Sequence, residues 1–588
     1  MPRQHRRALW VGANPLMVGA MWLVTAGAAA DDAPGGVADL VITNAKIWTG
    51  AQPSVAEPTG IAVIGDTIVA VGADAEVRTR VGANTTVIDA KGRRVIPGIT
   101  DSHTHFISGG LSLSRLYLRE VRGKQEFIAA VQNAAARAQK GEWVVGGRWS
   151  VESWERPETP NRSWLDPVTG EVPVFLNRMD GHEAVVNSAT LKLAGIDAAG
   201  PADPLGGEIE RDPKTHEPTG LLKESAMNLV GRLIPEPSDA QRYEALLRAM
   251  KHANSLGVTS VHDMSAPPDV EVFRRAAAEN AMTLRITAYL SMDEWSAHLD
   301  EVVKAAHDSH SPMFELVGLK GYMDGSLGSR TAYMREPYSD ATPTTPYPRG
   351  QLSAFASSES FRQQVIQADA KGLQMAVHAI GDEANHLLLD AYEAAAKENL
   401  VLSLEGGASD PSRLRTSRRP RAEHAQHLLV SDIPRFASLG VVASMQPFHK
   451  ADDGRYAEKA LGAERLKGSY AYRQLVDAGA LLVFGSDWPV VTLYPFAGID
   501  AAVNAKTLSG EVWLPSHSLT VVEALRAYTV SPPKAVHQES RLGTLESGRL
   551  ADLVILLDDP LTIPPSRLAD VKVVHTIVGG KVVFSAAP

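Results

Sequence analysis

Six polar residues, spread over most of the chain, each stand where an apolar run gives way to a loop. They are His103, His105, Lys320, His378, His424 and Asp487. The apolar runs before them have the length and composition of buried strands. Because parallel α/β barrels carry their chemistry at the carboxyl ends of the strands, we expect these six side chains to lie together.

Between the apolar runs the sequence predicts helices. Residues 360–371, 383–399 and 457–478 mix apolar and charged residues at the spacing of half-buried helices. Strands that alternate with helices indicate a parallel sheet. The chain is therefore expected to be an α/β protein.

The residue types of the six predict a metal site. In a strand, residues i and i+2 point to the same face, so His103 and His105 can converge on one ion. This pair is a weak signal alone, because the chain has 18 histidines, and the other four residues strengthen it. Imidazole and carboxylate ligands without cysteine suit zinc first, and manganese, iron, cobalt or nickel after it. A water on such an ion would have its pKa lowered toward ~7.

The chain resembles the amidohydrolase superfamily, and within it the family 3 members that include N-substituted formamide deformylases. The resemblance covers about residue 38 to the C-terminus. It rests on PGITDSHTHF (97–106), DGHEAVVNSATL (180–191), LKGYMDGSLGSRTA (319–332), VHAIGD (377–382), RAEHAQH (421–427), SMQPFH (444–449), GSDWPV (485–490) and SGRLADLVIL (547–556). It implies two divalent metal ions per chain, with zinc expected. His103, His105 and Asp487 would hold one ion, His378 and His424 the other, and Lys320 would bridge them as an N-carboxylated lysine.

Two of these residues have chemistry that can be argued from the side chains. A buried lysine beside cations loses its proton readily, so the neutral amine of Lys320 can capture CO₂ and become an anionic ligand. The alternative is a plain lysine paired with Asp324 and a single ion. Asp487 is expected to be catalytic, because a carboxylate beside a bound water can take its proton and pass it to the leaving nitrogen. The alternative is a role in ligation only.

Several further residues are candidates for substrate contacts. Asp180 and His182 are candidates by resemblance, and His262 and His449 because they end apolar runs. Two tryptophans in an expected insertion, Trp149 and Trp154, are more often packing residues. Asp324 follows the Lys320 strand. The proline-rich segment 334–350 is expected to be a substrate lid.

The N-terminus has the pattern of a signal peptide, residues 1–30. Arg6 and Arg7 precede an apolar stretch that ends in Ala28-Ala29-Ala30. A membrane anchor is the alternative, which Asn14 and Pro15 weaken. We expect export to the bacterial periplasm. The Arg6-Arg7 pair indicates the twin-arginine route for this export.

The domain organisation follows from the two ends of the chain. Both ends are rich in β-type sequence, and ADLVI occurs at 38–42 and at 551–555. We expect a small β-sandwich from 38–97 and 539–588, packed on a TIM-like (β/α)8 barrel at 98–538. An insertion of about 143–224 follows the first barrel strand, because the interval from His105 to Lys320 is far longer than two or three strand-helix units need.

The expected function is metal-dependent hydrolysis of a C–N bond, of the amide or N-formyl type, in a linear amide. A deaminase or esterase of the same superfamily, or a non-catalytic metal-loaded binding protein, stays open. The expected partner is a small-molecule amide. Nucleic acid is not expected, because the net charge is −10 and no basic stripe is present. No stable membrane insertion is expected after signal cleavage, and a homo-oligomer is left open.

The signal gives the first testable prediction. A twin-arginine route carries folded, metal-loaded protein, so replacing Arg6 and Arg7 with lysine should leave the precursor in the cytoplasm. Immunoblotting of cytoplasmic and periplasmic fractions measures this. Normal export of the variant would contradict the twin-arginine route.

Overall fold

The computed structural model describes residues 36–587 except for 52–56, 139, 150, 152–153, 179–182, 205–206, 292–294, 296, 310, 346 and 406–417. The expected signal segment, residues 1–30, therefore lies outside the described residues. Residues Val37–Pro588 form one compact unit. No helix in the described part of the chain is both long enough and apolar enough to cross a bilayer.

Eight parallel strands form a nearly closed barrel, which confirms the predicted α/β fold class. In spatial order they are β20 (Leu481–Phe484), β19 (Val442–Met445), β18 (Arg421–His424), β17 (Gln374–Ala379), β16 (Phe314–Tyr322), β15 (Arg285–Ser291), β14 (Val258–Ser265) and β7 (Ile99–Thr104). The two end strands meet where Thr104 bridges Trp488 and the Asp487 amide donates to the His103 carbonyl at 2.7 Å. The chain order of the strands thus runs around the ring.

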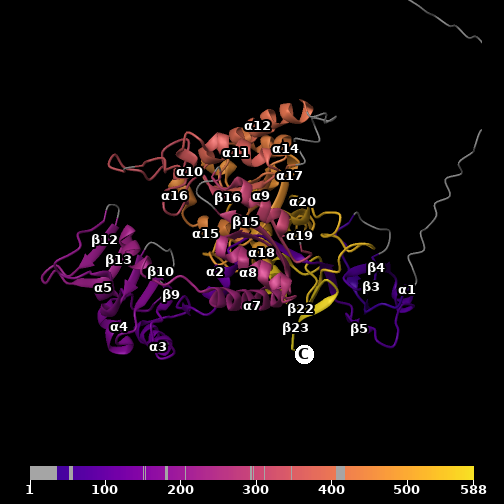
Figure 1. Ribbon diagram of the computed structural model, residues 1–588, viewed down its shortest axis with the longest axis horizontal. Coiled ribbons are helices and arrows are strands. Elements are labelled where there is room, and N and C mark those ends of the chain that lie inside the picture. Colours follow the sequence, from indigo (N-terminus) through magenta and orange to yellow (C-terminus); the bar gives the residue numbers. More distant parts are fainter. Residues whose placement is uncertain are drawn as a thin grey trace, which may run out of the picture. The chain divides into compact units, whose positions relative to one another are not determined.

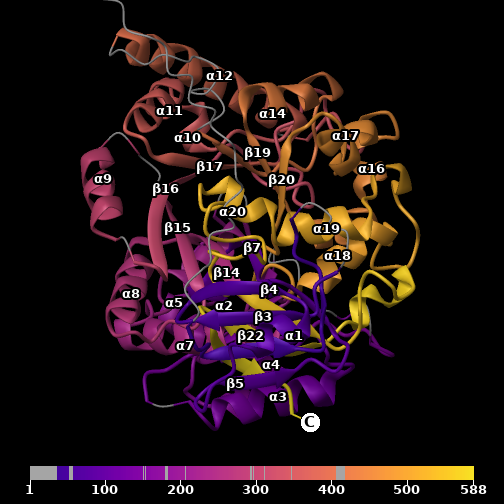
Figure 2. The same ribbon diagram turned by 90° about the vertical axis from the view of Figure 1, so that its right-hand side faces the viewer.

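Helices surround the barrel strands (Figure 2). The longer ones are α7 (Asp239–Ser255), α8 (Pro267–Ala278), α9 (Leu299–Asp308), α11 (Phe361–Ala370), α12 (Asp382–Glu405), α18 (Pro495–Asn504) and α19 (Val521–Tyr528). The predicted helices at 360–371 and 383–399 correspond to α11 and α12. Helix α7 begins at a capping box, in which Ser238 accepts from the Gln241 amide and Gln241 from the Ser238 amide.

The predicted helix at 457–478 is wrong. The segment forms α16 (Ala457–Leu461), a short 3₁₀ turn (Arg465–Gly468) and α17 (Tyr472–Asp477). Gly462 ends α16 with a φ of 75°, and Tyr470 lies in the left-handed region at 48°. These conformations interrupt the helical hydrogen bonds, so the segment is not one helix although its apolar spacing matches a helix throughout.

Two small sheets come from the two ends of the described chain. One contains β1 (Leu40–Thr43), β3 (Gly60–Ile64), β4 (Thr67–Gly72) and β5 (Thr86–Asp89); the other contains β2 (Lys46–Ile47), β6 (Arg94–Pro97), β21 (Leu553–Leu556), β22 (Val573–Val578) and β23 (Lys581–Ser585). Strand β6 pairs with β21, so N- and C-terminal segments share a sheet. Ile42, Ile61, Val95 and Leu553 bury apolar surface in one cluster between the sheets.

A further sheet follows the first barrel strand. Its order is β12 (Gly207–Arg211), β13 (Pro218–Glu224), β11 (Glu183–Val186), β10 (Val174–Arg178), β9 (Val144–Trp149) and β8 (Leu116–Tyr117). It is grouped with helices α3 (Lys124–Ala135), α4 (Arg162–Thr169) and α5 (Ser188–Ala194) (Figure 1). The insertion expected at about 143–224 falls in this sheet, which begins earlier, at β8.

Trp149 and Trp154 of this insertion are core residues in the structure. Trp149 and Trp154 are almost fully buried in one apolar cluster. Their indole N–H groups donate at 2.9 Å to the carbonyls of Leu176 and Val121. Burial of a large ring with a satisfied N–H is what a structural tryptophan requires.

The segment 334–350, expected as a lid, is tied to its surroundings in its described part. The Tyr338 hydroxyl donates to the Ala332 carbonyl at 2.8 Å, and the Ser339 amide donates to Ala460 at 2.8 Å. Asp340 forms an ion pair with Arg330 at 2.7 Å. These contacts hold the segment in place.

A buried ion pair joins the barrel to the sheet that carries the C-terminus, and it gives a stability prediction. Asp552, just before β21, accepts from Arg285 of β15 at 2.7 and 2.9 Å, and both side chains are buried. Loss of one charge leaves the other uncompensated, so Asp552→Asn should lower the free energy of unfolding by about 3 kcal/mol. Denaturant unfolding measures this. The exposed Lys371–Asp300 pair is the control; an Asp552→Asn midpoint equal to that of Asp300→Asn would contradict the prediction.

Candidate metal centre

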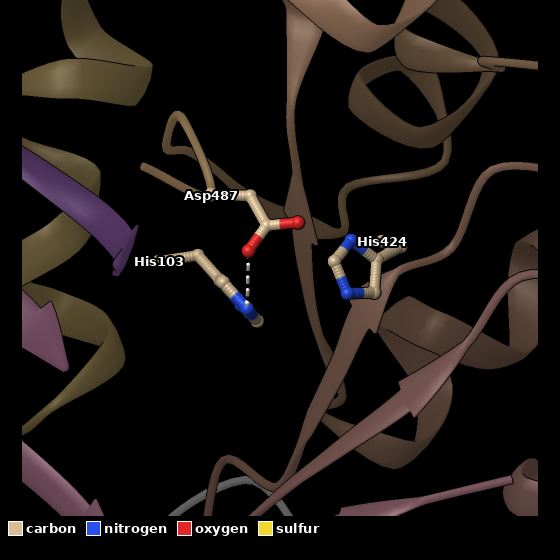
Figure 3. Close-up of side chains that lie close together, drawn as sticks. All are labelled: His103, His424 and Asp487. Atoms are coloured by element: carbon tan, nitrogen blue, oxygen red, sulfur yellow. Dashed lines mark ion pairs between the residues drawn. The ribbon is translucent and has the colours of Figure 1, made fainter. Parts of the chain in front are cut away.

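Three buried side chains from distant strands converge at the carboxyl end of the barrel. His103 comes from β7, His424 from β18, and Asp487 follows β20. One ligand atom from each lies within 4.8 Å of those of the other two. The Asp487 carboxylate turns one oxygen to the His103 ring, while the His424 ring lies on its other side (Figure 3). Asp487 Oδ1 is 3.5 Å from His103 Nε2.

Unusual backbone conformations aim two of these side chains at the centre. His424 has a φ of 74° and Asp487 a φ of 60°, both in the left-handed region that residues other than glycine rarely adopt. Arg421 and Glu423 share the inward face of β18, so a regular strand would turn the next residue outward. The left-handed turn at His424 brings its imidazole back inside. Such strain persists where the surrounding structure holds it, commonly at functional sites.

The ligand atoms of this cluster fit a divalent metal ion. Among the described residues, His103 Nε2 and Asp487 Oδ1 are buried without a hydrogen-bond partner. Unpaired buried polar atoms are costly, and an ion between them would remove that cost. Two imidazoles and a carboxylate are donors that zinc and related divalent ions prefer.

Two further predicted ligands lie beside the cluster. His105 is the N-cap residue of α2 (Phe106–Ser112), and its Nε2 is 3.3 Å from Asp487 Oδ1. The ring of His378, from β17, is 4.5 Å from that of His424 between centroids. His378 Nε2 is 3.1 Å from the Gly325 carbonyl, which leaves Nδ1 for an ion.

Lys320 ends near the same cluster, with its side chain buried. Its Nζ lies 4.3 Å from the centroid of the Tyr322 ring. In the described part of the chain no carboxylate forms an ion pair with it, and Asp324, its alternative partner, is otherwise engaged. The Asp324 carboxylate accepts from the backbone amides of Ile380, Gly381 and Tyr333 at 2.8–3.0 Å.

Burial sets the protonation states that metal binding needs. It lowers the pKa of His103 to about 4, with the Lys320 charge acting in the same direction, and the pKa of His378 to about 3. Both rings are therefore neutral at pH 7 and offer a lone pair. Burial alone would raise the pKa of Asp487, but the contact with His105 and the neighbouring histidines hold that pKa well below its usual range. Asp487 is therefore anionic at pH 7, the form in which a carboxylate can bind a metal ion.

The substrate candidates separate into groups. His449, on α15 (Pro447–Asp453), has Nε2 3.9 Å from Asp487 Oδ2 and lies at the centre. His262 does not reach a pocket mouth, because it is buried inside the barrel with Nδ1 2.8 Å from Arg421. Asp324 holds backbone amides beside His378. Asp180 and His182 lie outside the described residues.

Three residues contact the candidate ligand histidines or the neighbours of these histidines, although the sequence did not predict them as part of the site. They are Arg421, Glu423 and Gln446. The available signal was the pair of opposite charges two residues apart in RAEH, inside a strand expected to be buried.

The fold and site define an α/β barrel protein with a buried polar cluster at the carboxyl ends of its strands. A family model described as "Amidohydrolase family" matches residues 86–584. The chain belongs to this family, whose members are generally metal-dependent.

Individual relatives agree with this assignment. The chain is 38% identical to "Protein LONG AFTER FAR-RED 3" of Arabidopsis thaliana, over 93% of this chain and 92% of that protein. It is 28% identical to "N-substituted formamide deformylase" of Arthrobacter pascens, over 92% and 97%. A crystal structure of an uncharacterized metal-dependent hydrolase from Pyrococcus furiosus superposes with a TM-score of 0.70 at 28% identity, covering 89% of this chain and 100% of that one.

The placement of Lys320 gives a prediction about metal content. If Lys320 bridges two ions, Lys320→Ala should lose about half of the bound metal and most activity, and a short carboxylic acid should restore part of both. Elemental analysis of the purified protein measures the metal. Lys450, a second buried lysine whose Nζ donates to the Leu514 carbonyl at 3.2 Å, gives the matched control Lys450→Ala. Full metal content in Lys320→Ala would contradict the bridge.

Proposed function

We propose that the protein hydrolyses a C–N bond of a linear amide or N-formyl amine. The reaction would use a divalent metal ion, with zinc as the first candidate, bound at the cluster of His103, His424 and Asp487. The observation that carries this proposal is the buried carboxylate of Asp487 beside the imidazoles of His103 and His424, where, among the described residues, Asp487 Oδ1 and His103 Nε2 have no hydrogen-bond partner. The similarity to an N-substituted formamide deformylase supports the choice of bond.

We propose that the centre holds two ions. His103, His105 and Asp487 would hold one, His378 and His424 the other, and a carboxylated Lys320 would join them. The proximity of the His103, His424 and His378 rings, 4.5–4.8 Å between successive centroids, supports a compact centre. When bound, such ions supply a water of lowered pKa and an electrophile for the substrate carbonyl.

The position of Asp487 supports a role as a proton carrier. Its Oδ1 faces His103 and His105, whereas Oδ2 lies on the side of His449. We propose that this carboxylate accepts a proton from the attacking water and delivers it to the amide nitrogen as the C–N bond breaks. The products are a carboxylic acid, formic acid for an N-formyl amine, and a neutral amine. Protonation of the nitrogen is needed because an amide anion is a very poor leaving group.

The position of His449 supports a contact with the substrate. Gln426 Nε2 lies 3.2 Å from its Nδ1, and in the described part of the chain its buried Nε2 has no hydrogen-bond partner. When the Gln426 amide donates to Nδ1, the ring proton is on Nε2. We propose that this N–H donates to the substrate carbonyl oxygen.

The experiment that tests the function is a substrate screen. Metal-replete protein is incubated with N-formyl amines, linear amides, esters and amino-heterocycles, and released amine, acid or ammonia is measured. Turnover of amides or formamides with equal release of acid and amine supports the proposal. Turnover confined to esters or amino-heterocycles, or none above a metal-free control, contradicts it.

Asp487 gives the prediction for the chemical step. Asparagine keeps the shape and an oxygen for a metal, but it does not accept a proton at neutral pH. Asp487→Asn should therefore keep near-normal metal content while kcat falls by ~10²-fold or more. Metal content and the pH–rate profile are measured on one preparation, with Asp552→Asn as a buried aspartate away from the site. A metal-replete variant with wild-type kcat would make Asp487 a ligand only.

A further inference from the structure

A fully buried ion pair lies inside the barrel next to the metal cluster. Arg421 and Glu423 alternate on one face of β18, and both side chains are completely buried. Arg421 Nε donates to Glu423 Oε1 at 2.6 Å, and Nη2 donates to Oε2 at 3.2 Å. An interior ion pair adds little net stability compared with apolar side chains, so its presence calls for another role.

Further hydrogen bonds of Arg421 hold its guanidinium in place. Nη2 donates to the Ser102 carbonyl at 2.6 Å and to Ser444 Oγ at 3.0 Å. Nη1 contacts His262 Nδ1 at 2.8 Å and the Tyr289 hydroxyl at 3.2 Å. These partners come from β7, β14, β15 and β19. The guanidinium is therefore fixed from four other strands, and it fixes the Glu423 carboxylate.

Glu423 contacts a metal ligand with its second oxygen. Oε2 lies 2.6 Å from His103 Nδ1, so Nδ1 carries the proton. The other ring nitrogen, Nε2, faces Asp487 and is unprotonated. The His424 ring is held in the same way by a neutral group, with Nδ1 2.7 Å from Gln446 Oε1. One ligand thus has a charged partner and the other an amide.

We propose that Glu423, held by Arg421, and Gln446 are positioning residues that fix the tautomer and the ring orientation of His103 and His424. The inference rests on the proposed metal centre and deepens it. A hydrogen bond that fixes an imidazole raises the basicity of the nitrogen that binds the ion. Because carboxylate does this more strongly than amide, Glu423 contributes more to metal affinity than Gln446 does.

The test measures metal affinity directly. Zinc association is followed by competition with a chromophoric chelator, and the cobalt-substituted protein is examined for its visible absorption. Glu423→Gln should lower the zinc association constant by ~10- to 100-fold and change the cobalt spectrum. Gln446→Met, which removes the acceptor at similar size, should give the same kind of change but a smaller one.

Asp552→Asn is the matched control, because it weakens another buried arginine–carboxylate pair away from the ligand histidines. It should lower stability without changing zinc affinity or the cobalt spectrum. Wild-type affinity and spectrum in Glu423→Gln would overturn the inference. If that variant does not fold, unchanged affinity in Gln446→Met overturns it instead.

The same measurements separate this inference from the proposed function. Wild-type protein that binds neither zinc nor cobalt overturns the metal centre and this inference together. Wild-type protein that binds metal, with variants equal to it, overturns only the roles of Glu423 and Gln446.

Discussion

The contact between the first and last barrel strands is the constraint on which the metal cluster depends. The Asp487 amide donates to the His103 carbonyl at 2.7 Å, and Thr104 pairs with Trp488 in parallel register. His103 and Asp487 are far apart in the sequence, so only closure of the barrel places their side chains together. Closure also brings β18 across the ring, and with it His424. The site therefore depends on the closed barrel, because no local segment of the chain could bring these side chains together.

Burial has two effects at this centre. It lowers the pKa of His103 and His378, so that these imidazoles are neutral at pH 7 and can bind metal, and it leaves polar atoms without water. The barrel compensates most buried polar groups with protein partners, as in the contacts of Arg421. The ligand atoms of His103 and Asp487 are among the exceptions, and their closeness to each other and to His424 fits a metal ion between them.

The parts outside the barrel have cores of their own. The two terminal sheets share an apolar cluster that includes Ile42 and Leu553, and the insertion after β7 has another around Trp149. Because these clusters bury the aromatic and branched side chains of each part, they explain folding and not chemistry. The polar groups that can act on a substrate come from barrel strands and from the short helices that follow them.

The sequence by itself determined the alternating strands and helices of the α/β fold and the strand ends that carry His103, His424 and Asp487, because hydrophobic periodicity and i, i+2 spacing are local properties. The family followed from the motif blocks that the chain shares with it. The sequence determined less where a conformation depends on distant contacts. The break in the predicted helix at 457–478 and the left-handed turn at His424 are examples. Only the tertiary structure placed Glu423 against His103, because that contact depends on how strands pack across the barrel interior. The same packing buried His262 within the barrel, where a strand-end position had suggested a pocket.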